Sequence, residues 1–287
     1  MKLKDRLPLI FALACILTVL PSNGDSSVEL RWRDSTCRVA LRGGKVVSYV
    51  PGNSQEVIAL GARGGIPVCW PWFVNTAPTN TLFFGLLYNE VWRVVESKES
   101  ELLIDVVDSE ATRAVWPHEF RASLHVRLDE KLALRVTVEN RGSDVITCRD
   151  GFHTFFKVGD SLKCVVKGVD GLHYYYGVEP QFGYSRLLGG DFAVCRMKRG
   201  YVFAGGNREC RLVDPVFNRT ITVGYVGNAK TIVWNGLENP RFSDVGHEFV
   251  CVEGANMEPE DAYVLRPGET HSFSMTIGVC PGEERNP

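Results

Sequence analysis

Most of the chain alternates hydrophobic and polar residues in short stretches, and this pattern is typical of β-strands. The alternation is clearest over residues 101–107, 120–128 and 132–139, so each of these strands should have one buried and one exposed face. Gly, Pro, Asn and Asp residues separate the stretches, as expected of turns. Long helices are not expected. Further strands are expected over 28–32, 37–41, 45–50, 163–166, 201–203, 220–225, 231–234, 248–253 and 271–277.

This succession of strands predicts an all-β fold, a large antiparallel β-sandwich. The chain has 287 residues, of which 45% are hydrophobic, and can therefore bury a large core. No internal repeat or Pro-rich linker interrupts the pattern, so residues 25–287 are expected to form one domain. The formal charge of −2 gives no electrostatic reason to expect a nucleic acid or an anionic membrane surface as a partner.

Residues 1–24 differ from the rest of the chain. Lys2, Lys4 and Arg6 precede an apolar run over 7–20, and small and polar residues follow, which is the layout of a secretory signal peptide. An uncleaved signal anchor is the alternative, and no later stretch is apolar enough to cross a bilayer. We therefore expect the protein in the secretory pathway or outside the cell, with no membrane span after signal removal.

Eight cysteines remain after the first 24 residues are set aside. An even number permits disulfides in a secreted chain, but the sequence does not define their pairing. None of these cysteines has the Cys-x-x-Cys spacing of a metal site. Asn218 begins an Asn-Arg-Thr glycosylation sequon, which favours exposure of this segment to the secretory pathway.

Residues 63–73 (RGGIPVCWPWF) form the first candidate for chemistry. Arg63 is a potential ligand for an anion or hydroxyl. The two glycines permit close backbone approach, and the prolines stiffen the segment. Trp70 offers an aromatic wall for the apolar face of a sugar ring. The alternative interpretation is an aromatic corner that only fills the end of the sandwich.

His153 and Glu253 are the candidates for proton transfer. A histidine can donate and accept protons near neutral pH, and a carboxylate at the end of a buried strand can point into a cleft. Each residue taken alone can equally be structural, His153 as a buried histidine and Glu253 as a salt-bridged edge residue. Trp234 and Asn235 follow an apolar strand and offer a second aromatic wall and an amide.

Residues 63–73 resemble the signature loop of the glucose-6-phosphate 1-epimerases, a branch of the galactose mutarotase-like superfamily. Further segments match in the expected order. They are residues 152–160 (FHTFFKVGD), 233–235 (VWN), 249–253 (FVCVE) and 265–269 (LRPGE). The resemblance implies a supersandwich of antiparallel strands that uses no metal and no cofactor. It also implies interconversion of the α and β anomers of an aldohexose, with Glu253 as the base, His153 as the acid and Arg63 as a substrate ligand. The expected partner is a small-molecule sugar or sugar phosphate, and the expected state is a monomer.

The chain departs from this family at two positions. Relatives usually carry His-Gly-Phe-Ala-Arg after the signature loop, and this chain has Phe84 and Tyr88 in place of the histidine and the arginine. Loss of one charge-assisted contact to a phosphate costs about 1.5–3 kcal/mol. Phosphate recognition is therefore in doubt, and two alternatives stay open. One is a catalytically impaired carbohydrate-binding or structural protein, and the other is a cytoplasmic location, which is usual for relatives.

Overall fold

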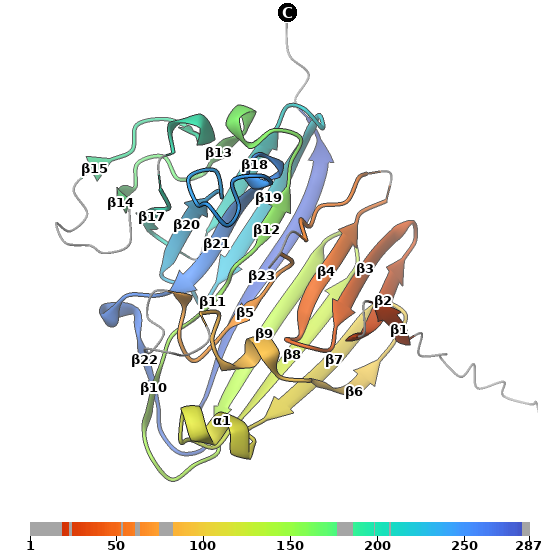
Figure 1. Ribbon diagram of the computed structural model, residues 1–287, viewed down its shortest axis with the longest axis vertical. Coiled ribbons are helices and arrows are strands. Elements are labelled where there is room, and N and C mark those ends of the chain that lie inside the picture. Colours follow the sequence, from red (N-terminus) through yellow and green to blue (C-terminus); the bar gives the residue numbers. More distant parts are fainter. Residues whose placement is uncertain are drawn as a thin grey trace, which may run out of the picture.

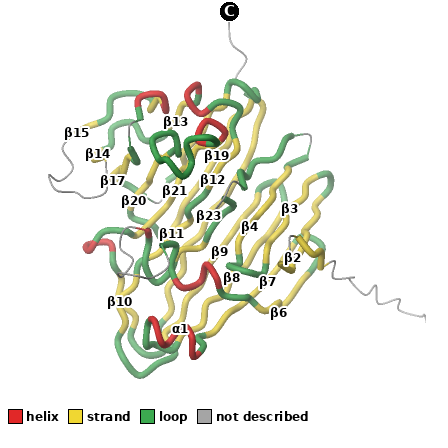
Figure 2. The backbone as a smooth tube through the Cα atoms, viewed as in Figure 1, coloured by secondary structure: helices red, strands yellow, loops and turns green. Residues whose placement is uncertain are grey.

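The computed structural model describes residues 19–22, 25–52, 54–60, 64–74, 83–176, 186–197, 199–206 and 208–282. Strands dominate this part of the chain, and the helices are short pieces between them (Figure 2). The strands form one nine-stranded, one eight-stranded, one four-stranded and one two-stranded sheet, with antiparallel pairing. The all-β, antiparallel architecture predicted from the sequence is therefore confirmed.

The nine-stranded sheet contains the most regular strands. Buried and exposed side chains alternate along β8 and β9, as the sequence pattern predicts for strands with one face on the core. In spatial order the sheet consists of β16 (Phe192–Ala193), β13 (Val165–Lys167), β18 (Glu209–Asp214), β19 (Arg219–Val226), β23 (Thr270–Pro281), β9 (Leu132–Asn140), β8 (Phe120–Leu128), β7 (Glu101–Val107) and β6 (Arg93–Ser97).

The eight-stranded sheet carries the candidate site. Its central strand, β21, is buried at every position, because other parts of the protein cover both of its faces. The spatial order is β15 (Arg186–Leu187), β14 (His173–Tyr176), β17 (Tyr201–Ala204), β20 (Lys230–Trp234), β21 (Phe249–Asn256), β11 (Asp150–Phe152) and β5 (Val68–Cys69), and β12 (Phe155–Lys157) also pairs with β21.

Two smaller sheets complete the fold. Figure 1 shows the four-stranded sheet at the opposite end of the molecule from β14 and β15. It consists of β1 (Val19–Ser22), β2 (Asp25–Trp32), β3 (Ser35–Ala40) and β4 (Lys45–Val50), and the two-stranded sheet of β10 (Ile146–Cys148) and β22 (Tyr263–Leu265). β1 belongs to the segment expected to be a signal peptide. Most of that segment, residues 1–18, lies outside the described residues, so the signal peptide stays a prediction.

The helices are all short. The α-helix α1 (Glu110–Val115) is capped at Ser109, whose hydroxyl accepts a hydrogen bond from the Thr112 amide at 3.2 Å. The 3₁₀ helices are η2 (Leu86–Asn89), η3 (Ser161–Lys163), η4 (Val194–Arg196), η5 (Gly246–Glu248) and η6 (Pro259–Asp261). In the described ranges, no helix has the length and hydrophobicity needed to span a membrane.

One contiguous buried cluster fills the space between the sheets, with side chains from β2–β4, β7–β9, β18, β19, β21 and β23. A smaller cluster on β5, β14, β17, β20 and β21 surrounds the candidate site. The eight cysteines in the described residues are free thiols, six of them buried, so the possibility of disulfides between them is not realised in this structure.

Candidate active site

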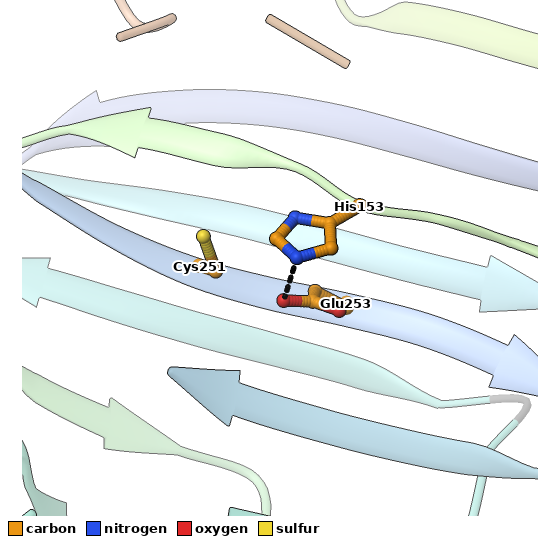
Figure 3. A group of neighbouring side chains, drawn as sticks. All are labelled: His153, Cys251 and Glu253. Atoms are coloured by element: carbon orange, nitrogen blue, oxygen red, sulfur yellow. Dashed lines mark ion pairs between the residues drawn. The ribbon is translucent and has the colours of Figure 1, made fainter. Parts of the chain in front are cut away.

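His153 lies directly across from Glu253 in the eight-stranded sheet. β11 and β12 pair with β21 in the same register and leave only His153 and Thr154 between them. Continuing that register from either side places His153 opposite Glu253, and residues opposed in this way share one face of the sheet. The His153 Nε2 and Glu253 Oε1 atoms are 3.4 Å apart (Figure 3). The two predicted proton-transfer groups therefore meet.

The signature segment holds His153 from the other side. The His153 amide donates a hydrogen bond to the Pro67 carbonyl at 3.1 Å, which extends the pairing of β11 with β5. The Phe155 amide donates to the Gly65 carbonyl at 3.1 Å. Residues 64–69 thus position the histidine backbone, which gives this segment a structural role in the site.

Four aromatic rings surround the His153 imidazole. The ring of Phe155 stacks on it at 4.8 Å between centroids, and Phe84 approaches edge-on at 5.0 Å. Trp234 lies at 6.0 Å and Phe73 at 6.2 Å. These rings are apolar and remove water from the histidine, so His153 and Glu253 are both almost fully buried. We refer to these four side chains as the aromatic cage.

Burial changes the acidity of both groups in a complementary way. Desolvation lowers the pKa of His153 to about 3 and raises the pKa of Glu253 well above its usual range. Both shifts favour the neutral form of each group, with the carboxyl proton on Glu253 and an uncharged imidazole beside it. A pair with one transferable proton can accept a proton at one atom and donate one at the other.

Phe84 and Tyr88, which stand where the resemblance implies a histidine and an arginine, lie at one end of the site. Their rings are 5.0 Å apart, and Phe84 contacts His153 directly. The Lys45 Nζ atom lies 5.1 Å from the centroid of the Tyr88 ring, in a cation–π arrangement. A positive charge is thus present beside Tyr88, although it comes from β4.

Trp234 and Asn235 differ in how they relate to the pair. Trp234 is paired with Cys251 across the sheet, and its ring belongs to the aromatic cage. The side-chain oxygen of Asn235 accepts a hydrogen bond from the Leu237 amide at 3.4 Å and so holds the turn after β20. Its contact with a substrate stays a prediction.

Trp70 points away from the pair. Its ring packs in the main core against Trp116 at 5.1 Å and Phe120 at 4.9 Å, and its Nε1 donates a hydrogen bond to the Tyr263 hydroxyl at 3.1 Å. This position gives no support to the expectation that Trp70 forms a wall for the sugar. Arg63, the other substrate ligand expected in the segment, lies outside the described residues.

Three residues near the pair were not singled out from the sequence. Phe73 and Phe155 belong to the aromatic cage, and Cys251 lies beside the pair. A signal for Cys251 was present, because residues two apart on a strand project from the same face and Glu253 follows it at that spacing. Phe73 and Phe155 gave no comparable signal, since the direction in which their rings point depends on turns whose geometry the sequence does not define.

Comparison with known proteins identifies the family. Residues 27–278 match the model of a family described as aldose 1-epimerase. The chain belongs to the aldose 1-epimerase family. A relative from Escherichia coli, named "Putative glucose-6-phosphate 1-epimerase", is 29% identical over 237 residues, which cover 75% of this chain and 78% of that protein. A plant relative with the same name, from Cenchrus ciliaris, is 24% identical and covers 90% of this chain and 86% of its own.

Solved structures of other epimerase-like proteins share the fold. A galactose mutarotase-like protein from Lactobacillus casei superposes with a TM-score of 0.75 at 15% identity, covering 88% of this chain and all of that one. A protein from Salmonella typhimurium described as a "putative mutarotase" gives a TM-score of 0.75 at 22% identity. The superposition covers 92% of this chain and 97% of that one. The galactose mutarotase-like β-sandwich expected from the sequence is therefore confirmed for this family member.

Proposed function

We propose that this aldose 1-epimerase family member interconverts the α and β anomers of an aldohexose, with Glu253 and His153 as the acid–base pair. The observation that carries the proposal is the 3.4 Å contact between the His153 Nε2 and Glu253 Oε1 atoms inside the aromatic cage. The reaction needs two proton-transfer groups beside one C–O bond, and this pair supplies two that together hold one proton.

The proton transfers balance at each step. In ring opening, one group takes the proton of the anomeric hydroxyl while the other gives a proton to the ring oxygen. The bond between C1 and the ring oxygen breaks, its electron pair stays on that oxygen, and C1 becomes an aldehyde carbon. Rotation about the C1–C2 bond exposes the opposite face of the aldehyde. Ring closure then reverses both transfers and restores the pair.

The charge state of the buried pair fits one direction of this cycle. With Glu253 as the base and His153 as the acid, opening starts from a carboxylate and an imidazolium and ends with two neutral groups. The dry aromatic cage favours the neutral pair, as the opposite pKa shifts of the two groups indicate. The cage therefore stabilises the state of the pair that accompanies the open-chain sugar.

The nominal substrate is glucose 6-phosphate, because the curated relatives carry that name. Tyr88 removes the arginine expected at the phosphate, whereas the Lys45 ammonium beside the Tyr88 ring offers a point charge that can bind an anion. We therefore propose Lys45 as the residue that determines whether the protein prefers the phosphorylated or the free sugar.

The test compares anomer exchange catalysed by the wild type and by the Glu253→Gln variant, measured by NMR exchange or polarimetry. We expect the variant to be slower by about 10²–10⁴-fold, the usual contribution of one acid–base group. The matched control is Glu248→Gln, since Glu248 lies on η5 with 59% of its side chain exposed. Equal rates for wild type and Glu253→Gln with glucose, galactose and glucose 6-phosphate would end the enzymatic proposal.

A second candidate is a carbohydrate-binding protein without turnover. The observation that favours it is the Phe84 ring, which packs directly on His153 at a position where the family resemblance implies a histidine. Calorimetric binding of a hexose, together with anomer exchange no faster than in buffer, would support this candidate over the first.

A further inference from the structure

Cys251 adds a third polar atom to the His153–Glu253 pair, and the proposed reaction does not use it. Cys251 and Glu253 are two residues apart on β21, so both side chains leave the same face of the strand. Figure 3 shows the Cys251 thiol and the Glu253 carboxylate, which both come from β21, beside the His153 imidazole. One ligand atom from each of the three residues lies within 4.8 Å of the others, and all three residues are buried.

We propose that His153, Cys251 and Glu253 form a binding site for a zinc ion, and that the ion inhibits the protein by occupying its acid–base pair. The site is distinct from a catalytic metal centre, because the reaction proposed above needs no metal.

The geometry of the three atoms suits a tetrahedral ion. Two nitrogen or oxygen ligands at about 2.0–2.1 Å from zinc are about 3.4 Å apart at the tetrahedral angle. The His153 Nε2 and Glu253 Oε1 atoms already have this separation, 3.4 Å. A sulfur ligand in a tetrahedral site lies about 3.6 Å from each of them. The Cys251 Sγ atom already lies within 4.8 Å of a ring nitrogen of His153 and of a carboxylate oxygen of Glu253.

The chemistry of the three ligands selects the kind of metal. A thiolate, an imidazole and a carboxylate are the ligand types of zinc sites, whereas calcium and magnesium require oxygen ligands. The charges of one thiolate, one carboxylate and a divalent cation sum to zero, which limits the cost of placing them in an apolar surrounding. Three protein ligands leave the fourth position for water or a sugar hydroxyl.

The aromatic cage supports the histidine as a ligand. Phe155 and Phe84 hold the imidazole by ring contacts, and its backbone is fixed by the bond to Pro67. The Nδ1 atom has no hydrogen-bond partner among the described residues. In the tautomer that carries the ring proton on Nδ1, the Nε2 lone pair is directed at the metal position.

The binding test uses Co²⁺ as a spectroscopic substitute for zinc on the full chain. We expect one Co²⁺ per chain, with thiolate-to-cobalt charge-transfer absorption and the strong visible bands of a tetrahedral ion, both abolished by one equivalent of Zn²⁺. Cys251→Ala should lose the charge-transfer absorption and weaken binding by more than the ~10–100-fold caused by removing a residue that merely supports a ligand. The matched control, Cys195→Ser, removes an exposed thiol and should bind as the wild type does.

Two results would overturn the proposal. One is the absence of any Co²⁺ spectrum at millimolar metal, and the other is a charge-transfer band that persists in Cys251→Ala. Because a core substitution can impair folding, Glu253→Gln serves as the second variant, and it must weaken Co²⁺ binding while all thiols remain. Urea unfolding of each metal-free variant checks that it folds.

The inhibition test rests on the proposed function. One equivalent of Zn²⁺ should suppress anomer exchange by the wild type at least tenfold, and a chelator should restore it. Unchanged exchange with zinc bound would refute the inhibitory role. A protein that binds Co²⁺ as expected but shows no exchange with any sugar would refute the proposed function and leave the metal site standing.

Discussion

Replacing Glu253 by glutamine should change how the stability of the protein depends on pH. Burial raises the pKa of the Glu253 carboxyl well above 4.5, so the carboxyl is protonated in the folded protein while it is ionised in the unfolded chain above that pH. The folded state then binds more protons than the unfolded state. The free energy of unfolding therefore falls as the pH rises from 4.5 towards the folded pKa.

His153 acts in the opposite direction. Burial lowers its pKa from 6.5 to about 3, so the unfolded chain binds more protons than the folded protein between these values, and stability is lost as the pH falls. Between pH 4.5 and 6.5 the two effects cancel, because the pair holds one proton in both states. The contribution of the pair to stability is thus greatest in this window and declines on either side.

On both the acid and the alkaline side, the folded and unfolded states differ by one bound proton, and this difference sets how steeply the free energy of unfolding changes with pH. A difference of one bound proton changes the free energy of unfolding by about 1.4 kcal/mol per pH unit. On the acid side the loss due to His153 between pH 4.5 and about 3 amounts to roughly 2 kcal/mol. Glu253→Gln removes the loss of stability on the alkaline side. The stability of this variant relative to the wild type should therefore increase by about 1.4 kcal/mol per pH unit, from pH 5 up to the pKa of Glu253 in the folded protein.

Urea unfolding followed by tryptophan fluorescence between pH 5 and 8 measures this difference directly. The Glu248→Gln variant, altered at an exposed carboxyl, should differ from the wild type by the same amount at every pH in this range. If the difference between Glu253→Gln and the wild type is also independent of pH, the carboxyl is ionised in the folded protein, and the aromatic cage does not stabilise the neutral state of the pair.

Two further predictions concern the ends of the site. Phe84→Ala should open the aromatic cage and raise the pKa of His153 towards 6.5, as followed by NMR titration of the ring. Phe83→Ala, at a neighbouring ring that is 44% exposed, is the control, and an unchanged His153 titration in Phe84→Ala would contradict the role of the cage. Lys45→Met should raise the KM for glucose 6-phosphate by about 10–100-fold and leave that for glucose unchanged, because it removes one charge-assisted contact. Lys98→Met, which alters an exposed ion-paired lysine, is its control, and equal effects on both sugars would exclude Lys45 as the phosphate ligand.

The sequence predicted strands correctly where alternating hydrophobic and polar residues show which side chains face the core. The predictions for 45–50, 101–107 and 120–128 coincide with β4, β7 and β8. The strand predicted over 163–166 begins instead at Val165, because residues 161–163 form a 3₁₀ turn capped by Asp160. The short helix α1 was missed, since six residues give too little periodicity, although Ser109 and Thr112 carry a capping signal.

The facing of the signature segment could not be predicted. Cys69 and Phe73 join the buried cluster around the site, whereas Trp70 and Trp72 join the main core. The tryptophans of this segment suggest an aromatic surface for a sugar ring. A shift of one residue in strand pairing, however, moves every side chain of the strand to the other face of the sheet. The pairing of Val68 and Cys69 with β11 sets that facing, and such a long-range contact leaves no local pattern.

A positive charge lies beside Tyr88, although this position is not the arginine that the family resemblance implies. The sequence predicts the loss of a phosphate ligand, because the position itself is no longer cationic. In the folded protein the Lys45 ammonium lies over the Tyr88 ring, and the Lys45 side chain passes close to Gly65 of the signature segment. A lysine binds phosphate as a point charge and lacks the fork of an arginine, so it discriminates less between a phosphate and another anion. The expected consequence is a broader choice of substrate, which measurements on a hexose 6-phosphate alone would not reveal.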